Sequence, residues 1–198
     1  MKLQDIAEIL RFQDRREPAY EDEEEDRNGL VYGEAKPDDF DPVTGFLIPG
    51  GISRVGLFRH PKKYALRKND LLMFYNGAVD KIGLTGLVID EVLAVPARLL
   101  CIIRPYAVSG PGLFMYLRSR TIRKDILGLA RPTSSETKAF LSLETLRGYE
   151  IDGLFVDAMK EAGDRAMELI ASYRASRKEQ EDMIYEIQKK LLNAWPED

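Results

Sequence analysis

Hydrophobic residues recur along the last quarter of the chain at a spacing that predicts one long helix over residues 154–193. The apolar and small positions alternate in steps of four and three, which is the heptad pattern of a coiled coil. A helix of that length spans about 60 Å and would expose a continuous apolar stripe, so we expect it to pair with another helix. The residues expected to form this seam are Phe155, Met159, Ala162, Ala166, Leu169, Tyr173, Met183 and Ile187.

The alternative is a helix that folds back on its own domain. The length of the helix disfavours this alternative, because a domain of this size is narrower than the helix is long. Ala162 and Ala166 are small enough to let two helices approach closely, and the polar Gln180 could fix their register. Parallel and antiparallel pairing both fit the seam.

Short apolar runs with glycine-bearing turns fill the middle of the chain and predict an irregular, curved β-sheet. The stretch from Leu66 to Asp90, LRKNDLLMFYNGAVDKIGLTGLVID, is typical of a β ribbon, and its Asn76-Gly77 pair suits a type I′ turn. We further expect a strand or helical turn in 3–12, a buried strand in 97–105, one or two helices in 110–131, and a strand with a short helix in 139–151. Together with the long helix, these elements predict an α+β fold.

We expect one α+β domain over residues 1–150, followed by the long helix of 154–193. Within the domain, residues 17–45 are acidic and carry prolines but few aliphatic side chains, which predicts a long mobile loop. A sharper interpretation is that this acidic insertion mimics DNA and screens a basic face until DNA displaces it.

Charge is strongly segregated, although the net charge of the chain is only −4. Residues 17–45 hold 11 acids and 2 bases, a net charge of −9. Residues 46–148 hold 16 bases and 7 acids, a net charge of +9. The basic middle of the chain favours a polyanionic partner such as nucleic acid.

A DNA-reading domain needs an apolar scaffold whose loops carry base-reading and phosphate-binding groups. Arginine and lysine read guanine, asparagine reads adenine, and most lysines contact phosphates. The candidate DNA-binding residues form three groups, and for each residue the alternative is ordinary surface charge. They are Arg67, Lys68, Asn76 and Lys81 in the ribbon; Arg131, Thr133, Ser134, Ser135, Thr137 and Lys138 in a polar loop; and Arg54, Arg59, His60, Lys62 and Lys63 in a basic connection.

Residues typical of catalysis are few. The single histidine, His60, lies in a basic stretch, and the single cysteine, Cys101, lies in LLCII, which predicts an inert buried thiol. Asp70, Asp80 and Asp90 fall on turns beside lysines and predict ion pairs rather than a metal cluster. The sequence holds no GxSxG, Walker A or helix-opening GxGxxG motif. We therefore expect no enzyme activity, no metal and no cofactor.

The cysteine count and the hydropathy also bear on location. A lone cysteine forms no internal disulfide and suits a reducing cytoplasm. No apolar run approaches the roughly 18–20 residues of a membrane span. We expect a cytoplasmic protein that does not enter a membrane.

Several short motifs follow one another in an order that resembles the specificity subunits of type I restriction–modification systems. The likeness covers roughly residues 46–193. The motifs are LRKNDLL (66–72), an Asn-Gly turn, KIGL (81–84), LLCIIRP (99–105), YLRS (116–119), ARPTSSETK (130–138), LSLETL (141–146) and the long coiled-coil helix.

The resemblance implies one target recognition domain over 1–150 and one helix, which is half of a full specificity subunit. Such a chain would recognise double-stranded DNA by sequence and dimerise through its helix. Methylation and cleavage would belong to partner methyltransferase (modification) and restriction subunits. One alternative is an assembly or protein-interaction module that acts through the coiled-coil helix without binding DNA. Another is a fragment of a larger enzyme, such as a fused methyltransferase, which the start at Met1 disfavours.

Overall fold

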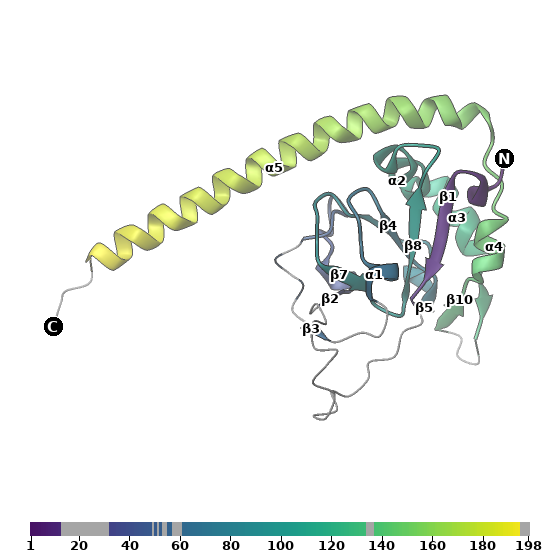
Figure 1. The fold of residues 1–198 in the computed structure, drawn as a ribbon, viewed down its shortest axis with the longest axis horizontal. Helices are drawn as coiled ribbons and strands as arrows, with labels where there is room; N and C mark the ends of the chain where they lie inside the picture. Colours follow the sequence, from purple (N-terminus) through teal and green to yellow (C-terminus); the bar gives the residue numbers. More distant parts are fainter. Residues whose placement is uncertain are drawn as a thin grey trace.

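The structure is a computed structural model, and it describes residues 1–12, 32–48, 50, 52, 55–56, 61–133 and 137–194. It has an α+β fold, in which three small sheets and four short helices form a domain and one long helix follows at the C-terminal end (Figure 1). The predicted fold class is therefore confirmed.

The central sheet contains four antiparallel strands in the order β1 (Ala7–Arg11), β8 (Leu100–Pro105), β4 (Leu71–Phe74) and β6 (Thr85–Leu87). The first four residues of β8 are fully buried, so the predicted buried strand in 97–105 is confirmed. A 3₁₀ turn, η1 (Leu3–Asp5), precedes β1. Residues 3–12, for which we expected a strand or a helical turn, thus contain both a helical turn and a strand.

Alternate residues of β4 and β8 supply two apolar clusters, one on each face of the central sheet. Leu71, Met73, Cys101 and Ile103 belong to the larger cluster, which also takes side chains from the helices. Leu72, Leu100 and Ile102 belong to the second cluster, which lies against β7 and the segment from Phe40 to Leu47. The central sheet is therefore covered on both sides.

Two further sheets have three strands each. One has the order β3 (Val55–Gly56), β2 (Tyr32–Ala35) and β7 (Ala94–Pro96), with β2 and β7 parallel. The other has the order β5 (Asn76–Ala78), β10 (Lys138–Phe140) and β9 (Arg131–Pro132), all antiparallel. Among the described residues, the 3₁₀ turns η2 (Pro37–Asp39) and η4 (Val79–Lys81) also lie between strands.

Serine side chains mark where three of the helices begin. Ser109 accepts a hydrogen bond from the Gly112 amide at the start of α2 (Gly110–Arg118). Ser119 and Ser142 do the same for α3 (Arg120–Gly128) and α4 (Leu143–Arg147). A serine before the first turn satisfies an amide that has no partner within the helix. The helices predicted in 110–131 and 139–151 are confirmed; α1 (Pro61–Tyr64) is a single turn.

The predicted Asn76-Gly77 hairpin turn is wrong. A type I′ turn needs positive φ at both central residues, but only Gly77, at 133°, has one. The two residues instead belong to β5 and pair with β10, which lies about sixty residues later in the chain. β4 and β6 are still antiparallel neighbours, and the chain passes between them through β5 and η4.

The expectation of a mobile loop is wrong for the second half of the acidic segment. Tyr32 and Ala35 are buried, and β2 is an internal strand between β3 and β7. Asp39 accepts from the Lys36 amide, and Asp41 accepts from the amides of Val43 and Thr44. These acids stabilise local turns, which composition alone does not reveal. The rest of the acidic segment, residues 17–31, lies outside the described residues.

The long helix α5 (Leu154–Ala194) begins beside η1, crosses over α2, and then extends well beyond the domain (Figure 1). Its first half packs on its own domain. Met159, Ala166 and Ile170 are buried in the larger apolar cluster, and the Tyr173 ring contacts the Phe46 ring at 5.3 Å between centroids. The expected dimer contacts of Met159 and Ala166 are therefore wrong, because the domain itself covers these side chains. Tyr173 is half-exposed, and its dimer contact remains a prediction.

Two glycines explain why α2 and α5 lie so close together. A β-carbon at Gly112 would lie 2.0 Å from the Met159 carbonyl oxygen, and one at Gly163 would lie 2.3 Å from Ser109 Oγ. Glycine removes both clashes and lets the two backbones meet. Arg174 adds a polar contact, because its Nη2 donates to Ile89 O and to an Asp90 carboxylate oxygen.

Other residues of the expected seam stay outside the domain. Leu169 and Met183 are exposed, Ala162 is half-buried, and the half-exposed ring of Phe155 lies 5.5 Å from that of Tyr116. The side chain of Ile187 lies outside the described part of the chain. For these residues the homodimer remains a prediction.

Candidate nucleic-acid interface

The small sheet of β5, β10 and β9 joins two of the three predicted groups of DNA-binding residues. Phe140 in the middle strand pairs with Asn76 on one side and with Arg131 on the other. Lys138 pairs with Ala78, and the Lys138 carbonyl accepts a hydrogen bond from the Thr133 amide. Residues from the ribbon and from the polar loop thus share one surface, although they are about sixty positions apart.

The pleat of this sheet points the polar residues outward. Ala139 is buried, so its face of the sheet lies against the core. Because side chains alternate along a strand, Lys138 and Phe140 lie on the other face, where the partly buried Phe140 also packs against the core cluster. Cross-strand partners share a face, which places Asn76 and Arg131 beside Phe140. Arg131 and Lys138 are exposed, and Asn76 and Phe140 are half-exposed.

Tyr75 ties this surface to the central sheet. Its ring lies 5.9 Å from the Phe140 ring and 5.7 Å from the Arg11 guanidinium carbon. Its hydroxyl donates to the Arg98 carbonyl at 3.0 Å, and burial raises the pKa of this hydroxyl. Tyr75 therefore holds the ends of β1 and of the β7–β8 turn at the same edge of the molecule.

Arg11 and Arg98 are both exposed, and the sequence-based candidates do not include them. The available signal was weak: Arg11 follows an apolar run and Arg98 precedes one. Lys81 lies at the same edge, since its Nζ is 5.9 Å from the centroid of the ring of Phe74, the residue before Tyr75. We call this surface the basic edge. It comprises Arg11, Asn76, Lys81, Arg98, Arg131 and Lys138.

Arg67 and Lys68 lie at the other end of β4, away from the basic edge. Asp70, which is 1% exposed, accepts from the Arg67 amide and forms an ion pair with Arg104. Arg67 and Lys68 line a pocket together with Glu8 and Asp70. Because the acids Glu8 and Asp70 also line this pocket, it suits a polyanion less well than the basic edge does.

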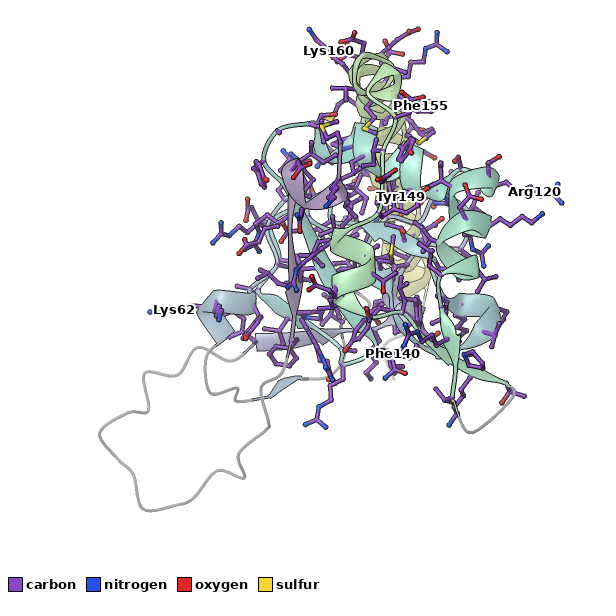
Figure 2. All side chains as sticks on the ribbon, turned by 90° about the vertical axis from the view of Figure 1, so that its right-hand side faces the viewer. Lys62, Arg120, Phe140, Tyr149, Phe155 and Lys160 are labelled. Carbon is purple, nitrogen blue, oxygen red and sulfur yellow. The ribbon has the colours of Figure 1, made fainter. Side chains whose placement is uncertain are left out.

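The third predicted group lies mostly beyond the described residues. Lys62 and Lys63 are exposed on α1, and Figure 2 shows Lys62 projecting from the side opposite Arg120. Arg54, Arg59, His60, Ser134 and Ser135 lie outside the part of the chain that the structure describes. Thr133 and Thr137 are exposed, and Thr137 O accepts from the Val79 amide.

Cys101, Asp70 and Asp90 are buried or paired with arginines. Burial raises the pKa of the Cys101 thiol to about 12, as expected of an inert buried cysteine. Asp90 pairs with Arg174 and Asp70 with Arg104, which confirms their predicted ion pairs. Within the described ranges, no three His, Cys, Asp or Glu residues form a metal-binding cluster. None of the described helices is long and apolar enough to cross a membrane.

The fold and its basic edge define an α+β domain with a projecting C-terminal helix. No protein-family model matches the chain, and no curated protein matches it. Among solved structures, the chain is similar to the type I restriction-modification system S subunit from M. genitalium, at a TM-score of 0.49 and 17% identity, over 96% of this chain and 42% of that one. It is also similar to the HsdS subunit from Thermoanaerobacter tengcongensis, at a TM-score of 0.40 and 15% identity, over 87% and 38%. The chain spans about two fifths of the length of these structures.

Proposed function

We propose that this chain recognises double-stranded DNA by sequence, as a specificity subunit of a type I restriction–modification system. The observation that carries the proposal is the outward face of the small sheet, where Asn76 and Arg131 flank Phe140. An amide and a guanidinium are the side-chain groups that form paired hydrogen bonds with adenine and guanine, respectively.

The spacing of these two residues suits one groove of DNA. Neighbouring strands lie about 4.8 Å apart, so Asn76 and Arg131, on the two sides of β10, are separated by about 10 Å. The major groove of B-DNA is about 12 Å wide and admits a β ribbon. Arg11, Lys81, Arg98 and Lys138 surround the pair and would bind phosphates, which position the protein without specifying sequence.

In this proposal the chain has no catalysis of its own. Partner methyltransferase subunits and a restriction subunit would modify and cut the DNA. The projecting half of α5 would hold either these subunits or a second copy of the chain, because Met183, Ile184 and Tyr185 are exposed there. The same exposed side chains favour the second candidate function, an assembly module that acts through the helix alone.

The test is selection from a pool of random duplex DNA, with and without the methyltransferase subunits, at two salt concentrations. We expect a short enriched motif and an affinity that falls steeply with salt. Asn76→Ala should remove the preference for adenine at one position, at a cost of about 1–3 kcal/mol. Lys138→Gln should weaken binding to all sequences equally and reduce the salt slope by about 0.9.

Lys160→Gln, at an exposed position of α5, is the matched control and should leave both the motif and the salt slope unchanged. A pool that stays unenriched under every condition, also after deletion of residues 17–31, would exclude sequence recognition. The assembly module would then be the remaining function, and its readout is the mass of the complex formed by the full chain and by a Met183→Glu variant.

A further inference from the structure

The helix α3 carries a basic face that none of the sequence-based candidates includes. Its nine residues, RTIRKDILG, contain Arg120, Arg123 and Lys124 but only one acid, Asp125. Arg120 and Lys124 are four residues apart and therefore lie on the same side of the helix. Both side chains are exposed, and neither forms a hydrogen bond or an ion pair with another described residue. In Figure 2 the side chain of Arg120 points away from the domain.

Two contacts make α3 continuous with the basic edge. Arg123 Nη2 donates to the carbonyl of Asp80, the residue before Lys81 in η4. Gly83 lies against the inner side of α3, where a β-carbon would be 3.3 Å from Ile126 Cγ2. Ile126 itself is fully buried, so the inner side of the helix is fixed on the domain.

The chain also leads directly from α3 into the basic edge. α3 ends at Gly128, and β9 begins three residues later at Arg131. Arg120, Lys81, Arg131 and Lys138 therefore follow one another along this side of the domain, where the exposed acids among the described residues are Asp80 and Asp125. A surface of this kind matches a duplex, which carries one negative charge per about 1.7 Å of its axis.

We propose that α3 is a second arm of the DNA-binding surface, in which Arg120 and Lys124 bind backbone phosphates of the duplex that the basic edge reads. This inference rests on the proposed function and extends it to residues that specify no base. Because phosphates carry no sequence information, α3 contributes affinity and salt dependence and leaves the selected motif unchanged.

The test uses the full chain with the double substitution Arg120→Gln and Lys124→Gln, and a duplex that contains the enriched motif. Two phosphate contacts contribute about 1.8 to the salt slope, so from 50 to 200 mM salt the wild-type affinity should fall about 12-fold more than that of the variant. The enriched motif should be the same for both proteins. Circular dichroism should be unchanged, because both side chains are exposed.

The matched control is Lys160→Gln with Lys178→Gln, which removes the same charge from exposed positions of α5. It should bind DNA as the wild-type protein does. If it loses as much affinity as the α3 variant, the net charge of the chain and not the position of α3 causes the effect, and the inference is overturned. A wild-type salt slope in the α3 variant, while Lys138→Gln lowers it, would also overturn the inference and leave the proposed function intact. Failure of the wild-type protein to select any motif would instead overturn the proposed function, and the α3 arm with it.

Discussion

Asp70, the residue before β4, and Arg104, in the neighbouring strand β8, form a largely buried bidentate ion pair. Arg104 Nε donates to Asp70 Oδ1 at 2.9 Å, and Arg104 Nη2 donates to Asp70 Oδ2 at 2.8 Å. Arg104 Nη2 also donates to Ala65 O, and the Arg67 amide donates to Asp70 Oδ2. Hydrogen bonding to Asp70 raises the pKa of Arg104. The ion pair lies at the end of the central sheet that is opposite the basic edge.

Asp70→Ala should destabilise the fold, because Arg104 would keep its charge in a mostly buried position without its partner. Removing one member of a buried pair costs about 3–5 kcal/mol in free energy of unfolding. Urea unfolding measures this loss. Asp164→Ala, at an exposed position of α5, is the control and should change the free energy by less than about 0.5 kcal/mol. A loss below about 1 kcal/mol for Asp70→Ala would contradict the structure.

Met159→Ala tests whether the first half of α5 packs on its own domain. Met159 is 2% exposed, whereas Met167, on the same helix, is 44% exposed. Truncation of a buried methionine costs about 2–5 kcal/mol, so Met159→Ala should lower the thermal midpoint clearly and Met167→Ala should not. The measurement is made at several protein concentrations. If the loss appears only where the chain is dimeric, Met159 contacts a partner and the intramolecular packing is wrong.

Tyr75→Phe should loosen the basic edge. The substitution removes the hydroxyl that donates to the Arg98 carbonyl. It should therefore lower the free energy of unfolding, measured in urea, by about 0.5–1.5 kcal/mol. Tyr106→Phe is the comparison, because its hydroxyl also donates to a carbonyl, that of Gln4, but its side chain is exposed. A smaller loss for Tyr75→Phe than for Tyr106→Phe would argue against Tyr75 as the residue that holds the edge together.

Cys101 should be unreactive in the folded protein. At a pKa of about 12, only about one thiol in ten thousand is ionised at pH 8, and the side chain is also fully buried. A maleimide should therefore label the native chain very slowly and the urea-unfolded chain fully. Rapid labelling of the native protein would show that β4 and β8 open more readily than their packing indicates.

Asp41 should make stability depend on pH in the acid range. Hydrogen bonds from the Thr44 backbone, and then from its hydroxyl and from Val43, hold the pKa of this carboxyl below its ordinary value of 3.8. The stabilisation is therefore complete above pH 3.8 and is lost as the pH falls through the lowered native pKa.

Asp41→Asn keeps an acceptor oxygen but removes the charge. At pH 7 the variant should be less stable than the wild-type protein by about 1 kcal/mol, because charged hydrogen bonds are stronger. The difference should shrink as the pH drops below 3.8. Asp38→Asn, an exposed acid in the same segment, should show no such difference. A gap between wild type and Asp41→Asn that is constant with pH would contradict the assigned cause.

Local patterns predicted the elements that their own residues specify. The apolar run of β8, the serine-capped helices α2 and α3, and the length of α5 all follow from short-range chemistry. The pairing of β5 with β10 could not be predicted, since register between distant strands depends on the packing of both. For the same reason the sequence pointed to Asn76 and Lys138 separately and missed Arg11 and Arg98, which contact Tyr75 in the folded chain.

For a similar reason, the sequence predicted a second helix as the partner of the first half of α5, whereas the chain's own domain packs against it. A heptad stripe is apolar whether a second helix or the chain's own domain covers it. What distinguishes the two cases is the complementary surface on α2, where Gly112 lets Gly163 and Met159 approach. A glycine in a helix of nine residues has no such meaning until the two helices are placed side by side.

Because α5 is one continuous helix, the direction in which side chains point at its far end is fixed relative to the domain. Tyr173 and Arg174 fix the helix on the domain, and the same helix continues to Ala194. Each residue inserted after Arg177 would turn the far end by about 100° and advance it by about 1.5 Å. Anything bound to the exposed side of Met183 would therefore take its orientation from the domain, and single insertions would change this orientation far more than the distance.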